Sequence, residues 1–528
     1  MASRVYVDPT HVSHQAPSDP IPPSHRRALR RLVAVLVAAA SGVLVAVAFP
    51  PFDQVWAMPL GLAGLLVLTG RTRGRGGFGL GLAFGVGFML VLMNWLTIIG
   101  WDAWSVLSLL EGLFYAVMAM TWSWVGRRTG WPLAVAALWV GGEFLRGTFP
   151  FGGLPWGRLA FGLVDTPFVR YGRLGGTALV SFLAVLVVAL VVDVIERRRW
   201  SRLAVGSAVV AVLIMALSPL LPVGAAGAVG SVQVAAIQGN VPGKGLNPFA
   251  HRRAVVDNHA AATEQLAAQV AAGSKPKPQL VIWPENSTDI DPFANRSVYA
   301  EINRAVQTIG VPTLVGAVVS GPDPDHVENM GIVWSPTTGP GAHYIKQHLV
   351  PFGEYIPFRS VLTKFISRLK EIPRDFAPGH RPGDLQLGPV RIGDVICFEV
   401  AYDGLVRDVI KGGARLLVVQ TNNATYVGTG QLQQQFAMSQ YRAIETGRSV
   451  VIASTDGISG IINPDGTIVV QTKQKTRAII DERVTTADGV TLGVRIGGWL
   501  DIALALAGLL AAVGAYLGNR RTLGRMAA

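Results

Sequence analysis

Long apolar runs separated by short basic segments dominate the pattern of hydrophobic and polar positions. Eight runs are rich in Leu, Val, Ala, Gly and Phe, and most approach the roughly 17–25 residues that span a bilayer as a helix. A basic segment before the first run also fits a cleaved signal peptide, but the further runs favour an uncleaved first span. The pattern predicts a polytopic α-helical membrane domain of about eight spans, with runs at 32–49, 57–69, 78–99, 106–125, 131–147, 175–195, 203–221 and 498–517.

Arginines follow every even-numbered run, and few basic residues follow the odd-numbered ones. They occur at Arg71, Arg127, Arg197 and Arg520 and at their close neighbours. Lys and Arg in short loops remain on the cytoplasmic side of a membrane. We therefore expect both termini in the cytoplasm and the long region between the seventh and eighth runs on the extracytoplasmic side.

The region between the last two runs has a different pattern. Short β-rich segments alternate with stretches of helical spacing at 254–272 and 431–447, which predicts a layered α/β domain. The expected organisation is a disordered tail at 1–28, a membrane domain at 29–224, the exported domain at 225–495, and a last span with a basic tail at 496–528. The β-rich segments are 232–240, 279–286, 311–319, 390–399, 414–423 and 449–466.

Composition supports a membrane protein, because half of the residues are hydrophobic and only 15% are charged. The net charge of +13 could suggest nucleic acid, but the arginines lie in clusters between apolar runs, where they act as topology signals. A single cysteine excludes an internal disulfide framework, and no Cys/His grouping has zinc-site spacing. We expect no metal, no cofactor and no nucleic-acid partner.

The single cysteine, Cys397, ends an apolar segment of the exported region. A thiol becomes a good nucleophile beside a cation and a base. Glu285, after the apolar LVIW, could act as the base, and Lys346 could face a negative oxygen. Taken singly, a cysteine can be a core residue, a glutamate can cap a helix and a loop lysine can be merely solvated.

Three segments together resemble a known superfamily. WPENS (283–287), YIKQHLVPFGEYIPF (344–358) and VICFE (395–399) occur in the order Glu, Lys, Cys, which resembles the carbon–nitrogen hydrolase (nitrilase) superfamily. With spans on both sides, the chain resembles the apolipoprotein N-acyltransferase family over residues 30–520, and WVGGEFLRGTFPFGGLPWG (139–157) is similar to its membrane segment. The resemblance implies a nitrilase-like αββα sandwich in the exported domain.

The resemblance also implies roles for individual residues. Glu285 would be the general base, Lys346 would stabilise an oxyanion and Cys397 would be the nucleophile, with Glu354 and Glu399 as supporting carboxylates. In the implied ping-pong reaction, an acyl chain passes from a membrane phospholipid through a Cys thioester. The acceptor would be the N-terminal amine of diacylglyceryl-cysteine on an apolipoprotein, at the bacterial cytoplasmic membrane.

Some positions depart from the family pattern, and other functions stay open. The chain has Asn423-Ala424-Thr425-Tyr426 where many relatives have Asp-Ala-Trp-Phe, has Phe398 where some have Tyr, and lacks an expected tryptophan near Asn247. Glu143 and Arg146, three apart within a predicted span, are expected to form an ion pair inside the bundle. Alternative functions are a membrane-tethered amidase, or a non-catalytic scaffold or partner of a polyprenol-phosphate mannosyltransferase.

Overall fold

A bundle of apolar helices forms one half of the molecule. The fold is known from a computed structural model that describes residues 23–197, 202–241, 252–366, 369–370 and 373–527. One helix falls on each of the eight predicted apolar runs, so the polytopic helical domain is confirmed. These helices are α1 (Pro23–Ala46), α2 (Ala57–Thr69), α3 (Arg75–Leu92), α4 (Trp101–Val125), α5 (Trp131–Arg146), α6 (Gly172–Arg197), α7 (Arg202–Leu217) and α13 (Leu492–Ala527).

The helices differ in length. Among the described residues, six are long and apolar enough to cross a membrane, namely α1, α3, α4, α6, α7 and α13. Helix α2 has 13 residues and α5 has 16. At about 1.5 Å per residue, α2 is roughly 20 Å long, which is shorter than the roughly 30 Å hydrocarbon core. The count of eight spans therefore stays a prediction.

Small residues let the bundle helices approach closely. A Cβ added at Gly42 of α1 would lie 2.0 Å from the Phe84 carbonyl oxygen of α3, and one at Gly85 would lie 2.8 Å from Gly112 of α4. Membrane helices gain stability from van der Waals packing, which such close approach improves. These glycines are thus contact points between neighbouring helices of the folded bundle.

The region between α7 and α13 folds into two sheets packed face to face. Apolar side chains such as Ile282 and Leu314 of one sheet and Ile392 and Val418 of the other fill the space between them. The first sheet has the order β13-β1-β2-β3-β4-β5, with β6 paired to β4, and the second has the order β12-β11-β10-β9-β8-β7. The strands are β1 (Ala228–Gln238), β2 (Leu280–Ile282), β3 (Thr313–Ser320), β4 (His326–Ser335), β5 (Gly339–Ile345), β6 (Asp375–Phe376), β7 (Asp384–Leu387), β8 (Val390–Ile396), β9 (Leu416–Thr421), β10 (Val450–Ser454), β11 (Gly460–Ile462), β12 (Ile468–Gln471) and β13 (Ala478–Ala487).

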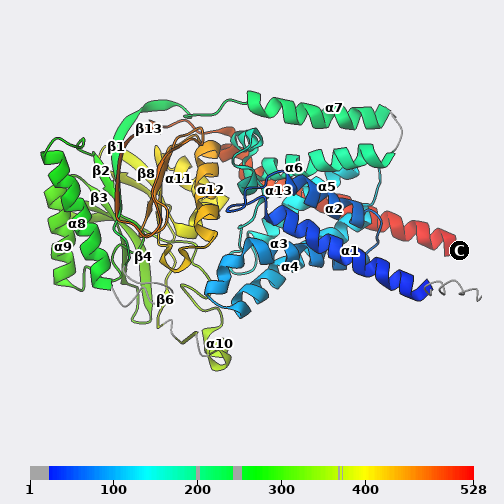
Figure 1. Ribbon diagram of the computed structural model, residues 1–528, viewed down its shortest axis with the longest axis horizontal. Coiled ribbons are helices and arrows are strands. Elements are labelled where there is room, and N and C mark those ends of the chain that lie inside the picture. Colours follow the sequence, from blue (N-terminus) through cyan, green and yellow to red (C-terminus); the bar gives the residue numbers. More distant parts are fainter. Residues whose placement is uncertain (1–22, 198–201, 242–251, 367–368, 371–372, 528) are drawn as a thin grey trace, which may run out of the picture.

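Helices cover both outer faces of this sandwich (Figure 1). Helices α8 (Arg252–Ala271) and α9 (Arg296–Ile309) pack on the first sheet. Helices α11 (Asp403–Lys411) and α12 (Gln431–Thr446) lie between the second sheet and the membrane bundle, and α12 contacts α6. The predicted αββα sandwich is confirmed, and one of its helical layers is also the contact layer with the bundle. A short helix, α10 (Arg359–Phe365), lies at the edge of this junction.

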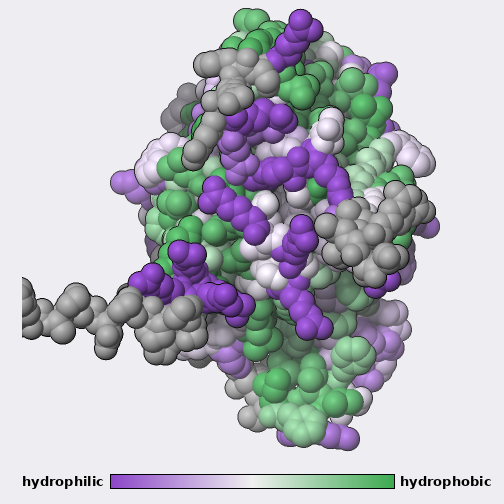
Figure 2. Space-filling view, turned by 90° about the vertical axis from the view of Figure 1, so that its right-hand side faces the viewer, coloured by the Kyte–Doolittle hydropathy of each residue, from purple (hydrophilic) through white to green (hydrophobic). Residues whose placement is uncertain are grey.

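Both described ends of the chain lie at the end of the bundle away from the sandwich (Figure 1). Figure 2 looks onto that end and shows hydrophilic side chains gathered between apolar surfaces. Exposed arginines of this end include Arg71, Arg75, Arg128, Arg202 and Arg520. The basic residues that motivated the predicted orientation therefore lie together on one end.

Three details differ from the sequence-based expectations or extend beyond the described residues. Arg146 pairs with Glu111 of α4 at 3.0 Å, whereas Glu143 accepts from Trp139 and from the Leu159 backbone N–H, so the predicted Glu143–Arg146 pair is wrong. The Arg146 side chain thus reaches across to α4 instead of pairing within its own helix. Helix α1 begins at Pro23, inside the predicted tail, while residues 1–22 and the segment around Asn247 lie outside the described residues.

Candidate active site

The predicted site residues follow strands that end at the same edge of the sandwich. Strands β1, β2 and β3 are parallel neighbours, as are β8, β9 and β10. Glu285 follows β2, Cys397 follows β8 directly, and Lys346 follows β5. Carboxyl ends of parallel strands are where sites form in open α/β sheets. Here Glu285, Lys346, Glu354 and Cys397 line one cavity of about 510 Å³.

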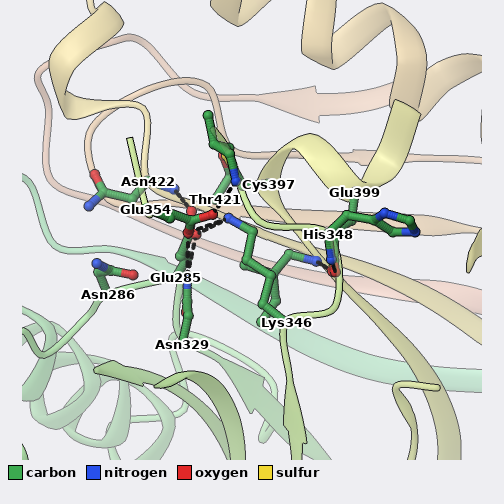
Figure 3. Close-up of polar contacts among 12 residues, drawn as sticks. Glu285, Asn286, Asn329, Lys346, His348, Glu354, Cys397, Glu399, Thr421 and Asn422 are labelled. Carbon is green, nitrogen blue, oxygen red and sulfur yellow. Dashed lines mark hydrogen bonds and ion pairs between the residues drawn. The ribbon is translucent and has the colours of Figure 1, made fainter. Parts of the chain in front are cut away.

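The ammonium group of Lys346 lies between two carboxylates (Figure 3). Its Nζ is 3.0 Å from Glu285 Oε1 and 2.8 Å from Glu354 Oε1, and the side chain is almost fully buried. Burial alone would lower the pKa of Lys346, but the charges of Glu285 and Glu354 outweigh it and raise that pKa well above its ordinary value. Lys346 is therefore a fixed cation and not a proton donor near neutral pH.

Glu285 is held by donors from three other segments. Asn329 Nδ2 donates to its Oε1 at 2.7 Å, and the backbone N–H of Asn422 donates to its Oε2 at 2.7 Å. Lys346 supplies the third contact. These three contacts come from different elements and fix the position of the Glu285 carboxylate at the edge of the cavity.

The nucleophile candidate sits on a strained turn. Cys397 has φ 56°, a left-handed conformation uncommon for non-glycine residues, and it begins the 3-10 turn Cys397–Ala401. Thr421 Oγ1 donates to its Sγ at 3.4 Å. Burial, reinforced by the charge of Glu285 and opposed by Lys346, raises the pKa of the Cys397 thiol to about 12. The resting thiol is therefore protonated and needs a base to react.

Glu399 joins the cysteine turn to the segment after Lys346. Its Oε1 accepts from the backbone N–H groups of Gln347 at 2.7 Å and His348 at 3.0 Å, and its Oε2 accepts from Ile396 N–H at 2.7 Å. Tyr344 also donates its hydroxyl to this carboxylate. Burial raises the pKa of Glu399 to about 7, opposed by Lys346 and these backbone donors. Glu399 is fully buried and positions two loops, whereas Glu354 contacts Lys346 directly.

An apolar cavity of about 170 Å³ adjoins the first one. Phe398, Val350 and Tyr426 line both cavities, so the two are neighbours at the cysteine turn. The bundle supplies the other wall of the apolar cavity, including Leu107, Trp95 and Trp156. The site therefore adjoins an apolar cavity between the two domains.

Gln434 of α12 fixes the two tryptophans of that wall. Its Oε1 accepts from Trp156 Nε1 at 2.7 Å and from Trp95 Nε1 at 3.2 Å. Its Nε2 donates to the carbonyl oxygens of Pro50 and Leu92 at 3.0 Å each. Trp156 in turn packs on Phe398 with ring centroids 4.9 Å apart. One buried amide therefore connects four segments of the bundle to the wall beside Cys397.

The structure adds polar residues to the site residues that the sequence predicts. Asn286 and Asn422 follow strands β2 and β9 and line the cavity, whereas Gln238 and Asn423 bond elsewhere. Asn329 was missed, because nothing local in strand β4 distinguishes it. Among the described residues, no three His, Cys, Asp or Glu side chains group so as to hold a metal ion.

Comparisons with known proteins agree with this architecture. Residues 41–190 match the family profile of the apolipoprotein N-acyltransferase N-terminal domain, and residues 233–489 match that of carbon–nitrogen hydrolases. The apolipoprotein N-acyltransferase of Mycolicibacterium smegmatis is 37% identical over 94% of this chain and 88% of its own length. This chain belongs to the apolipoprotein N-acyltransferase family. The family member from Gloeobacter violaceus is 30% identical, over 91% of this chain and 94% of that protein.

Among solved structures, a nitrilase-superfamily amidase from Nesterenkonia AN1 resembles the sandwich part of this N-acyltransferase family member. It is 17% identical and covers 52% of this chain and 95% of its own, with a TM-score of 0.36.

Proposed function

We propose that this protein transfers a fatty acyl chain from a membrane phospholipid, through a thioester at Cys397, to the N-terminal amine of diacylglyceryl-cysteine on apolipoproteins. The observation that carries the proposal is that the polar cavity with Glu285, Lys346 and Cys397 adjoins the apolar cavity at the bundle, with which it shares wall residues. An amidase for small polar amides has no use for an apolar space walled by membrane helices. An acyl chain is the occupant that such a space suits.

In the first half-reaction, Glu285 takes the proton of the Cys397 thiol as Sγ attacks the ester carbonyl carbon. Lys346 faces the negative oxygen of the tetrahedral intermediate, where its fixed charge lowers the barrier most. The carbon–oxygen ester bond then breaks, and Glu285 returns the proton to the leaving oxygen of the lysophospholipid. The acyl group remains on sulfur as a thioester.

In the second half-reaction, the neutral α-amine of the acceptor attacks the thioester carbonyl carbon. Glu285 accepts the proton that the nitrogen loses, the carbon–sulfur bond breaks, and Cys397 regains a proton from Glu285. Splitting the transfer into two steps lets two bulky amphiphiles use one site in turn. Glu354 orients Lys346 in both steps, and Glu399 holds the cysteine turn.

The proposal includes the arrangement in the membrane. The membrane domain is residues 29–224, the catalytic domain 225–495 and the last span with its tail 496–528, with the catalytic domain outside and both termini in the cytoplasm. Support comes from the exposed arginines at the bundle end away from the sandwich (Figure 2).

Intact-protein mass spectrometry tests the chemistry. The purified chain is incubated with a phospholipid, beside a Cys397→Ala variant that removes the only thiol. We expect the wild-type chain to gain one acyl mass that neutral hydroxylamine removes, and the variant to gain none. A diacylated lipopeptide amine should then discharge the adduct into a triacylated product.

Two outcomes would contradict the proposal. Loss of the adduct in water at the same rate with and without the amine would identify a hydrolase. Absence of an adduct while phospholipid is demonstrably bound would identify a non-catalytic lipid-binding protein.

A further inference from the structure

A second cavity lies on the junction between bundle and sandwich, lined by elements other than those around Cys397. It has a volume of about 370 Å³ and is lined by residues of the start of α6, the end of the α7 segment, the start of α13 and the loops next to β1 and β13. Arg170, Arg173 and Arg495 contribute to its wall together with Leu174, Leu221 and Leu492. The wall thus combines three cations with an apolar surface.

Two of the arginines are held in place by backbone carbonyls. Arg170 Nη1 donates to the carbonyl oxygens of Pro219 at 2.5 Å and Leu221 at 3.3 Å, and Arg173 Nη1 donates to that of Gly224 at 2.5 Å. A guanidinium has five N–H donors, so each side chain is fixed while keeping donors for a ligand. Fixed arginines lose less entropy on binding an anion.

The third arginine differs from the other two in its contacts. Arg495 is exposed, and among the described residues its side chain makes no hydrogen bond or ion pair. The described residues that line this cavity include no Asp or Glu. The adjacent Asp488 lies 4.0 Å from Arg415 in an ion pair. Three arginines line the cavity and one aspartate, Asp488, lies beside Gly227 at its border, so the charge around the cavity is net positive.

Its position in the fold fixes its level relative to a membrane. Three candidate spans, Pro167–Arg197, Arg202–Leu220 and Leu492–Arg520, have one end at this cavity. Their apolar side chains remain exposed beside it, as Leu220, Leu492 and Trp499 do at 74%, 49% and 76%. On the other side the cavity meets Gly227 and Gly489 of the sandwich. It therefore lies where the hydrocarbon region gives way to headgroups.

We propose that this cavity binds the phosphodiester and glycerol of a membrane phospholipid, at a site separate from the acyl donor site and beyond the proposed reaction. Arginine binds phosphate oxygens with paired, charge-assisted hydrogen bonds. The apolar wall of Leu174, Leu221 and Leu492 suits the upper parts of acyl chains and would have no role with free phosphate. Basic pockets between membrane helices recognise lipid headgroups in this way.

Photo-crosslinking with peptide mapping tests the site. The full chain carrying Cys397→Ala, which prevents acyl transfer, is titrated in detergent with a phosphatidylglycerol that bears a diazirine close to the glycerol. We expect saturable labelling of peptides spanning 217–224 and 489–496, apart from any label near the Cys397 turn. Arg495→Gln should raise the half-saturating concentration at least about tenfold, because it removes a charged hydrogen-bond donor without breaking an internal bond.

Matched variants and ligands complete the test. Arg495→Lys keeps the charge and should retain most of the labelling. Arg296→Gln, an exposed arginine on α9 at the far side of the sandwich, should behave as the parent. Equal labelling of the parent and Arg495→Gln, or equal labelling by a diazirine diacylglycerol without phosphate, would overturn the proposal. Competition by millimolar inorganic phosphate as strong as that by unlabelled phosphatidylglycerol would identify a free-phosphate site instead.

Discussion

Two buried ionic clusters lie at opposite ends of the turn Cys397–Ala401. The site cluster, Glu285, Lys346 and Glu354, lines the cavity at Cys397. The junction cluster joins the sandwich to the bundle, where Asp403 lies 2.6 Å from Arg158 and 2.7 Å from Arg442. Arg442 also donates to the carbonyl oxygens of Val400 and Ala401 at the end of the turn and pairs with Glu445.

Both clusters consist of buried ion pairs, but only the site cluster lines a cavity. Asp403, Arg158 and Arg442 are each exposed by 6% or less, and they form ion pairs with one another inside the protein. In the site cluster, the same kind of buried pair borders open space with a thiol beside it. Buried charge therefore does not by itself mark a candidate active site. The feature that distinguishes the site cluster is the cavity that it lines. Substitutions in each cluster should separate loss of chemistry from loss of structure.

The largest expected effect is on chemistry with little effect on folding. Glu285→Gln keeps the shape of the side chain but removes the proposed base, and Cys397→Ala removes the proposed nucleophile. Each should lower the acyl-transfer rate at least about 10³-fold, because the groups act as a unit. Rates of lipopeptide acylation measure the loss, and melting temperature in detergent checks the fold. Glu328→Gln makes the same change one residue from Asn329 and is the control, which should keep near-normal activity. A similar loss in Glu328→Gln would mean that the net charge near the site, and not the carboxylate at position 285, controls the rate.

The junction cluster should show the opposite behaviour. Asp403→Ala leaves Arg158 and Arg442 buried without their shared carboxylate, which should cost about 3–5 kcal/mol of stability. The measurement is the melting temperature and the yield of folded protein in detergent. Asp408→Asn, an exposed aspartate on the same helix, is the matched control. A folded Asp403→Ala variant of normal stability but without activity would mean that the junction cluster acts on chemistry.

The sequence predicts that several of these residues lie at strand ends. Glu285 and Cys397 each follow a short β-rich segment, and parallel strands bring such ends together. Lys346 was a candidate from the residues alone, and the resemblance to the superfamily joined it to Glu285 and Cys397 in one triad. The sandwich and the bundle could be predicted because periodicity and apolar length are local properties of the chain.

The partners of these residues depend on contacts that no local pattern records. Asn329 reaches Glu285 only through the antiparallel register of β3 and β4. Arg146 pairs with Glu111 because of how α4 and α5 pack, although the spacing suggested Glu143. Asp403 meets Arg158 across 245 positions, and Gln434 meets Trp95 across 339. Long-range packing decides such pairs, so a single sequence gives no signal for them.

Gln434 joins the sandwich to the bundle, as the junction cluster does, but through a neutral amide instead of charged groups. Gln434→Leu leaves two indole N–H groups and two carbonyl oxygens without their partner, which should cost about 2 kcal/mol or more. Because Trp95 and Trp156 wall the apolar cavity, KM for a long-chain donor should rise more than kcat falls. Kinetics with donors of different chain length measure this. Gln440→Leu on the same helix is the control. If Gln434→Leu changes KM equally for long-chain and short-chain donors, Gln434 contributes to stability alone.

The smallest expected effect tests the charges around Cys397 directly, through alkylation of the only thiol by iodoacetamide. Burial and Glu285 raise the pKa of Cys397 to about 12, and Lys346 lowers it. Glu285→Gln removes a negative charge, so it should lower that pKa, increase the thiolate fraction at about pH 8 and speed alkylation several-fold, although it abolishes acyl transfer. Lys346→Met removes the cation and should slow alkylation. Opposite shifts in the two variants would show that charge in the site cluster controls the thiol, whereas equal shifts of one sign would mean that access to the cavity, and not charge, limits the reaction.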